Sequence, residues 1–191
     1  MLQIVLLVFI VLDPFGNLVT INALLKDSSP QQRRWIMLRE SLVATLILML
    51  AVFAGGPVMS ALGLKSFALG IAGGIVLFMI AIGMVFPAKR ILDEEEAVDP
   101  VLVPIAIPII AGPGTISLIL LLAQKHDRGT VAASVALASV ASTLILVLSP
   151  GIYAFLGVRG ARAMERLMGM LLVMMAVQMV LDGLQAYLAH A

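Results

Sequence analysis

Residues 1–25 read MLQIVLLVFIVLDPFGNLVTINALL, an apolar run that is broken near its middle by Asp13 and Pro14. A helix needs about 20 mostly apolar residues to cross the hydrocarbon core of a membrane, and this run is long enough. Proline in a helix interior costs about 3 kcal/mol and pushes the preceding residue out of the helical region. Asp is also a preferred N-cap, and proline a preferred first helical residue. The stretch predicts a spanning helix in two halves, with the second half beginning at Pro14.

The composition of the whole chain is that of a membrane protein. Its 191 residues are 62% hydrophobic and 12% charged, and the mean hydropathy is +1.14. Soluble domains carry about a quarter charged residues. A soluble fold of this size cannot bury so much apolar surface, because exposed area falls too slowly with size. The lipid bilayer is therefore the predicted partner of most of the chain.

Several classes of function are excluded by what the sequence lacks. A net charge of +1 gives no basic field for nucleic acid. The chain has no cysteine, and neither His126 nor His190 has a second ligand at metal-binding spacing. We predict no metal site and no cofactor. We also predict that the chain is not an enzyme, because it offers one deep carboxylate and no nucleophile–base pair at membrane depth.

Six stretches are long and apolar enough to span the membrane, which predicts an all-α, polytopic protein. They are Met1–Leu25, Ser41–Leu62, Ser66–Phe86, Val101–Ala123, Val131–Leu156 and Met164–Leu188. The first is not expected to be a cleaved signal peptide, because it has no basic n-region and its apolar run is interrupted. Nine Lys and Arg residues fall in the first, third and fifth connections and three on the other side. Cytoplasmic loops are enriched in these residues, so both termini are predicted to be periplasmic.

The chain contains an internal repeat. The turn Leu62-Gly63 parallels Leu156-Gly157, the segment 74–82 parallels 169–177, and Gly16 aligns with Gly114. Each copy holds three spans, an odd number, so the second copy must enter the membrane from the opposite side. Inverted-topology repeats of this kind are typical of secondary transporters. We predict a first repeat over residues 1–92, an acidic linker over 93–100, interpreted as solvated rather than as a cation-collecting patch, and a second repeat over 101–191.

A second break falls at Gly112-Pro113-Gly114 in the fourth span. Non-helical backbone at membrane depth needs protein or a water-filled cavity around it, so the two breaks are expected to face each other. Each half-helix that begins at a break directs free N–H groups and a positive dipole end toward the membrane centre, where they can bind an anion. The predicted substrate-binding residues are Asp13, Phe15, Gly16, Asn17, Gly112, Gly114, Thr115 and Gln178.

Asp13 is the one acidic residue near the centre of a predicted span. It can hold a substrate ammonium, a coupled proton or a sodium ion. The alternative is a structural cap only. Other polar residues receive less specific interpretations: Arg39-Glu40 and Glu165-Arg166 as interfacial anchors, with gating ion pairs as the alternative, and Ser139 and Ser142 as sites of close helix packing.

Three motifs resemble the MarC family of bacterial inner-membrane proteins. They are Asp13-Pro14-Phe15-Gly16-Asn17, the segment from Pro104 to Pro113, and Glu165-Arg166-Leu167-Met168-Gly169 followed by Gln178-Met179. The resemblance covers essentially the whole chain. It implies six helices in a bacterial inner membrane and cation-coupled transport of small neutral amino acids such as glycine, alanine, serine and threonine. The first segment is short before Asp13, which places its outer half-helix at the lower limit of length.

The sequence thus predicts a secondary transporter that moves a small zwitterion by alternating access, coupled to Na⁺ or H⁺. An ion channel or passive pore is the first alternative, and it predicts flux that does not saturate. A flippase or exporter of another amphipathic substrate is the second, and it predicts a groove open to the lipid. The sequence leaves the oligomeric state open, a homo-oligomer included.

Overall fold

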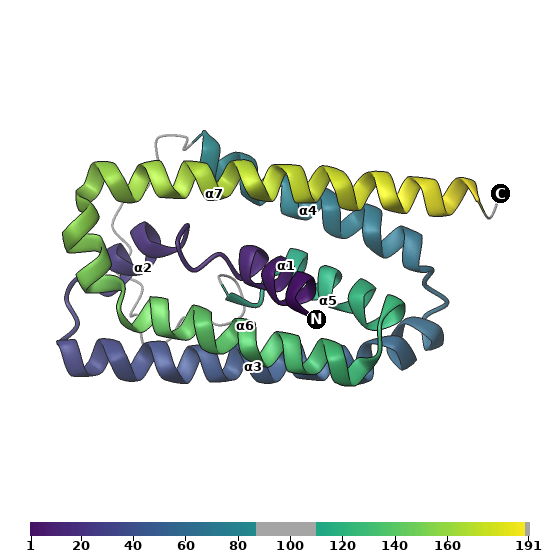
Figure 1. Ribbon diagram of the computed structural model, residues 1–191, viewed down its shortest axis with the longest axis horizontal. Coiled ribbons are helices and arrows are strands. Elements are labelled where there is room, and N and C mark those ends of the chain that lie inside the picture. The colour runs from purple at the N-terminus through teal and green to yellow at the C-terminus, as the bar shows by residue number, and fades with distance from the viewer. Residues whose placement is uncertain (87–109, 190–191) are drawn as a thin grey trace.

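The computed structural model describes residues 1–86 and 110–189. Among these residues the chain forms seven helices, drawn in Figure 1. They are α1 (Leu2–Leu12), α2 (Leu18–Leu24), α3 (Pro30–Ala61), α4 (Ser66–Val85), α5 (Pro113–Lys125), α6 (Arg128–Val147) and α7 (Ser149–Leu188). The predicted acidic linker, the first part of the fourth predicted span and His190 lie outside the described residues.

Four of these helices, α3, α4, α6 and α7, are long and apolar enough to cross a membrane. Their outward faces carry large apolar side chains, as expected where the surrounding solvent is lipid. The prediction of an all-α polytopic membrane fold is confirmed at this level. The residues that illustrate the apolar outer surface include Leu46, Leu50, Phe53, Met79, Val140, Leu144, Met170 and Met174.

The second span begins earlier than the predicted Ser41. The helix α3 starts at Pro30, because Ser29 and Gln32 form a capping box in which each side chain binds the other's backbone N–H. Pro30 occupies the first turn, where a missing N–H is tolerated. These local signals extend the helix by about three turns beyond the apolar stretch.

The fifth span ends earlier than the predicted Leu156. The helix α6 ends at Val147, and Ser149 and Pro150 already belong to the first turn of α7. Gly157, with φ 64° and ψ 175°, then breaks α7, so that residues 149–156 turn at the end of the bundle. Figure 1 shows this turn at the left, before α7 runs the length of the molecule and contains the sixth predicted span.

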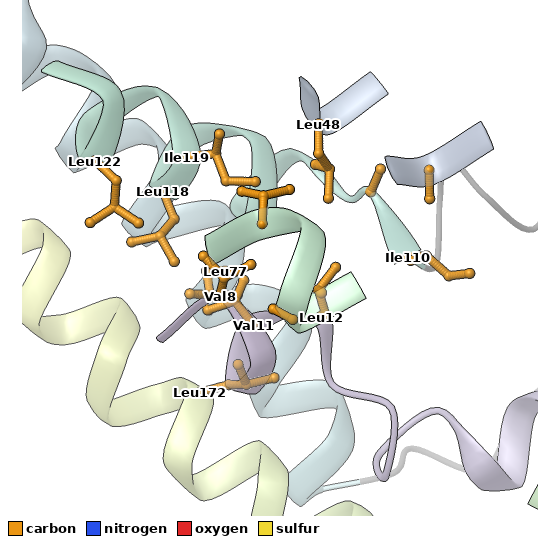
Figure 2. Close-up of a cluster of buried hydrophobic side chains, with 14 of the residues drawn as sticks. Val8, Val11, Leu12, Leu48, Leu77, Ile110, Leu118, Ile119, Leu122 and Leu172 are labelled. Atoms are coloured by element: carbon orange, nitrogen blue, oxygen red, sulfur yellow. The ribbon is translucent and has the colours of Figure 1, made fainter. Parts of the chain in front are cut away.

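The helices pack in pairs around a central layer. The helices α3 and α6 lie side by side, as do α4 and α7, and the shorter α1 and α5 lie between the two pairs (Figure 1). The apolar part of the core is built from α1 and the faces of its neighbours. Figure 2 shows its central part, with the labelled residues Val8, Val11, Leu12, Leu48, Leu77, Ile110, Leu118, Ile119, Leu122 and Leu172.

Candidate functional site

The first break is a five-residue turn between α1 and α2. The backbone of Asp13 is in the left-handed region, with φ 48° and ψ 56°, and ends α1 after Leu12. The Asp13 carboxylate turns back on the chain, and its Oδ1 accepts a hydrogen bond of 3.0 Å from the N–H of Gly16. The Asp13 carbonyl accepts the N–H of Asn17 at 3.2 Å. Both interactions hold the turn closed while Asp13 stays 4% exposed.

The prediction that Pro14 begins a half-helix capped by Asp13 is wrong. Pro14 lies within the turn, and α2 begins at Leu18, with Asn17 in the N-cap position. Asp13 instead occupies the C-cap position of α1. The left-handed backbone of Asp13 ends α1 at this residue. The Asp13 side chain accepts the Gly16 N–H inside the turn, so it does not cap the start of α2.

Gly16 is required by the close approach of the Asp13 carboxylate. A Cβ at position 16 would overlap Asp13 Oδ2 and the terminal methyl of Met84 in α4. Phe15 places its ring edge-to-face on Phe9, with centroids 6.2 Å apart. Asn17 donates from Nδ2 to the Leu12 carbonyl at 3.4 Å. The side chains of Phe15 and Asn17 thus contact the first half of the broken helix itself.

The second break has the form that the sequence predicts. The helix α5 begins at Pro113, with Gly112 as its N-cap. The N–H groups of Gly114 and Thr115 lie in the first turn, where no intrahelical acceptor exists for them. Gly114 packs α5 closely against α4, because a Cβ there would stand 3.0 Å from Leu77 Cδ1. Gly112, Gly114 and Thr115 are all buried.

The two breaks meet in the interior. The Thr115 hydroxyl, 4% exposed, donates to the Val11 carbonyl at 3.5 Å. Within the described part of the chain, no backbone N–H is hydrogen-bonded to the carbonyls of Val11 or Leu12. The C-terminal end of α1 therefore lies beside the N-terminal end of α5. Carbonyls that accept only side-chain hydrogen bonds among the described residues, and the negative dipole end of one helix, adjoin first-turn N–H groups and the positive dipole end of the other.

A pocket of about 320 Å³ lies near this contact, lined by the first part of α1, the start of α4, the second half of α5 and the last part of α7. Leu7 of α1 and Leu118 of α5 are part of its lining. They lie four residues before Val11 and three residues after Thr115, which is about one helical turn, or roughly 5 Å, in each case. The pocket thus approaches the paired helix ends from one side of the molecule.

Gln178 lies in this pocket and not beside the breaks. It is exposed, and its Nε2 donates to Asp182 Oδ1 at 2.6 Å. Asp182 Oδ2 is 3.9 Å from Lys125 Nζ. The structure therefore brings together seven of the eight candidate residues at the two breaks and places the eighth at the mouth of the pocket.

Two sets of polar residues that were interpreted from the sequence as interfacial anchors or packing residues are buried in the interior. Glu40 lies well inside α3, where it is buried with its carboxylate 2.7 Å from Arg39 Nη2. Ser139 and Ser142, interpreted as packing residues, line a small cavity with Ser41. A signal was present in the sequence, because the pattern Ser-x-x-x-Thr-Leu-Ile-Leu occurs at 41–48 and again at 139–146.

Comparison with known proteins gives matches over nearly the whole chain. The model of the MarC family, described as integral membrane proteins, matches residues 1–188. The UPF0056 inner membrane protein YhgN of Escherichia coli K12 is 38% identical over 186 residues, covering 95% of this chain and 94% of its own. The UPF0056 membrane protein MJ0972 of Methanocaldococcus jannaschii is 33% identical, over 92% and 82%. A UPF0056 membrane protein of Aquifex aeolicus is 32% identical, over 94% and 90%. No solved structure matches the chain.

Proposed function

The chain belongs to the MarC family of integral membrane proteins, and we propose that it is a secondary transporter for a small neutral amino acid. The transporter works by alternating access in the bacterial inner membrane and couples the amino acid to a cation. The location is supported by the inner-membrane relative and by the four long apolar helices.

One observation carries the proposal: the end of α1 and the start of α5 meet in the interior, with Thr115 bonded to the Val11 carbonyl. A zwitterion has one group for each helix end. Its ammonium suits the carboxylate of Asp13 and the carbonyls at the end of α1, each of which has two lone pairs and accepts one side-chain hydrogen bond. Its carboxylate suits the N–H groups of Gly114 and Thr115, since helix N-termini bind anions. Broken helices serve amino-acid transporters in this way.

The substrate carboxylate is assigned to α5 alone. The turn at Phe15-Gly16-Asn17 was expected to share it, but the Gly16 N–H is already bonded to Asp13, and α2 starts only at Leu18. The first break therefore supplies the negative half of the site and the second break supplies the positive half.

The pocket near the contact is suited to be the entrance. Its volume of about 320 Å³ is at the small end of the range for ligand pockets, roughly 300–1,000 Å³. It opens at the end of the bundle that holds Lys65, Lys125 and Arg128, which is the periplasmic end under the orientation proposed from the loop charges. Alternating access then requires a second state in which the breaks are reached from the end that holds Arg33 and Arg34.

The pairing of helices supports the inverted repeat and six membrane crossings. In the proposed repeat, α3 corresponds to α6, α4 to α7, and the broken helix α1–α2 to the fourth span that contains α5. Each of these equivalent helices contacts its counterpart. Gly63 and Gly157, equivalent in the repeat, have φ values of 66° and 64°. A two-fold axis in the membrane plane places equivalent elements against one another.

Transport by purified protein in liposomes tests the proposal. Liposomes loaded with unlabelled alanine are diluted into labelled glycine, alanine, serine or threonine, with an imposed Na⁺ or H⁺ gradient. We expect saturable exchange that is stimulated by one of the gradients. Flux that rises linearly with concentration and carries current favours a pore, and lipid scrambling without amino-acid exchange favours a flippase. Absence of exchange for every amino acid contradicts the substrate class.

A further inference from the structure

A second, much smaller cavity lies between α3 and α6 beside the last residue of α1. Its lining contains polar residues of both α3 and α6 together with apolar residues, and it consists of Leu12, Ser41, Thr45, Ile110, Ser139, Ser142, Thr143 and Leu146. Leu12 and Ile110, which belong to its apolar wall, are labelled in Figure 2. The volume is about 10 Å³, close to what a single water molecule needs and too little for an amino acid.

Three serine hydroxyls in this lining have no hydrogen-bond partner among the described residues. They belong to Ser41, Ser139 and Ser142, which are 4%, 7% and 3% exposed. Buried hydroxyls are nearly always satisfied, because an unsatisfied one loses its hydrogen bonds to water without replacing them. Three of them around one cavity indicate that the cavity has an occupant.

Two threonine hydroxyls in the lining already donate their protons to backbone carbonyls. The Thr45 hydroxyl donates to the Ser41 carbonyl, and the Thr143 hydroxyl donates to the Ser139 carbonyl, both at 2.7 Å. A hydroxyl that has donated its proton keeps its lone pairs for another group. The lining thus holds five hydroxyl oxygens that can act as electron-pair donors toward an occupant.

These residues come in equivalent positions of the repeat. The separations 139 − 41, 143 − 45 and 114 − 16 are all 98 residues, so the hydroxyl pairs follow the same register as the glycines of the two breaks. Because α3 and α6 lie side by side, the two pairs contribute to one cavity. Ser142 is the exception, since its counterpart is Ala44.

The electrostatics of the cavity favour a positive occupant with one charge. Leu12 ends α1, so the negative end of that helix dipole is directed toward this region, and Asp13 follows at the next position. No carboxylate is part of the described lining. Divalent Ca²⁺ and Mg²⁺ are bound in proteins chiefly with the help of carboxylates, whereas neutral oxygens suffice for a monovalent ion.

We propose that Ser41, Thr45, Ser139, Ser142 and Thr143 form a binding site for a dehydrated Na⁺ ion at the end of α1. The small volume selects Na⁺ over the larger K⁺. Its role as the coupling ion rests on the proposed transport function, because an ion at this place fixes the α1 end that receives the substrate ammonium. Binding of Na⁺ itself does not depend on that function.

Thermal unfolding of the full-length protein in detergent, followed by far-ultraviolet circular dichroism, tests the site. NaCl is raised at constant ionic strength against choline chloride, and KCl and LiCl are compared. A ligand that binds the folded state raises the midpoint with its concentration. We expect the midpoint to rise with Na⁺ and much less with K⁺. Equal midpoints in Na⁺ and choline overturn the proposal and leave water as the occupant.

Ser142→Ala is the decisive variant, because alanine already stands at the equivalent position 44 and is compatible with this helix pair. Changes around a bound ion typically weaken affinity by about 10- to 100-fold, so we expect the half-saturating Na⁺ concentration to rise by at least about tenfold. Ser134→Ala is the matched control, since Ser134 is buried on the same helix but is bonded to the Thr130 carbonyl. An unchanged Na⁺ response in Ser142→Ala and Ser139→Ala contradicts the site.

The same measurement separates this proposal from the transport proposal. Alanine or glycine is added at saturating and at zero Na⁺. A Na⁺ response without any response to amino acids retains the ion site and counts against the substrate. A response to amino acids that is independent of Na⁺, and equal in Ser142→Ala, retains the substrate and rejects the coupling role of the ion, whose binding is decided by the Na⁺ titration alone.

Discussion

Gly74 of α4 packs directly on the carbonyl oxygen of Ala176 in α7, so closely that a Cβ on Gly74 would stand 2.8 Å from that oxygen. The same contact occurs in reverse, since a Cβ on Gly169 of α7 would stand 3.1 Å from the carbonyl oxygen of Ala81 in α4. Gly74 and Gly169 are equivalent in the repeat, and so are Ala81 and Ala176. A reciprocal contact of this kind is the mark of a two-fold relation between the two helices.

Gly74→Ala is expected to destabilise the α4–α7 pair. The new methyl group meets backbone on α7, which cannot move as a side chain does, and overpacking of this kind typically costs about 1–3 kcal/mol. We expect a lower midpoint of thermal unfolding in detergent. Gly83→Ala on the same helix is the control, because nothing lies within 4 Å of its added Cβ. Equal midpoints for the two variants are inconsistent with the packing described.

Asp13→Asn separates the structural role of Asp13 as a helix cap from the role of its negative charge in transport. Asparagine keeps an acceptor for the Gly16 N–H and tolerates the left-handed backbone at φ 48°. We expect stability within about 0.5 kcal/mol of the parent, a typical bound for a substitution that keeps its interactions. Transport should fall by at least tenfold, on the order of 1.4 kcal/mol.

Asp13→Ala is the companion variant, and it loses the acceptor as well as the charge. Its unfolding midpoint should fall clearly, because alanine in the left-handed region costs about 1–2 kcal/mol. The measurements are thermal unfolding and amino-acid exchange in liposomes. If Asp13→Asn transports normally with unchanged dependence on Na⁺ and pH, Asp13 is a structural cap only.

Thr115→Val removes the hydroxyl that joins α5 to the Val11 carbonyl and preserves the volume of the side chain. We expect the KM for amino-acid exchange to rise by about tenfold, or about 1.4 kcal/mol. Thr115→Ser keeps the hydroxyl and should retain most of the activity. Both KM and the maximal rate are measured, and a Thr115→Val variant with the parent's KM shows that this contact does not shape the substrate site.

Gly63→Ala and Gly157→Ala are both expected to destabilise the protein. Both glycines have φ near 65°, and nothing lies within 4 Å of an added Cβ at either position. The penalty is therefore conformational, on the order of 1–3 kcal/mol for a residue with a Cβ that is held in such a backbone conformation. Asparagine is not expected to relieve the penalty at position 157, because φ 64° combined with ψ 175° is adopted readily only by glycine. Thermal unfolding provides the measurement, and a neutral Gly157→Ala contradicts the left-handed turn in α7.

Gln178→Ala is expected to leave substrate affinity almost unchanged. Gln178 is exposed at the mouth of the pocket, where it binds Asp182, and surface changes of this kind usually stay within about 0.5 kcal/mol. Uptake at several substrate concentrations measures the KM. A large rise in KM, comparable to that of Thr115→Val, places Gln178 at the substrate after all.

Local sequence signals predicted the positions of the breaks better than their form. Proline at 113 after Gly112 was sufficient to predict the start of α5, because proline at the first helical position needs no N–H partner. The same argument failed at Pro14, where Asp13 bonds to Gly16 inside the turn. Asp-Pro is compatible with either a helix start or a turn. In the observed turn, Gly16 fits closely between the Asp13 carboxylate and the side chain of Met84. Met84 is distant in sequence, so this contact is not visible in the local sequence.

The sequence by itself determined the membrane environment, the helical class and the places where the helices break, because hydropathy and proline act over short stretches of chain. Only the tertiary structure decided which helix ends meet. The contact of Thr115 with Val11 and the cavity that joins Ser41 to Ser139 bring together residues about a hundred positions apart in the chain. Packing across helices creates these sites, and no local propensity encodes it.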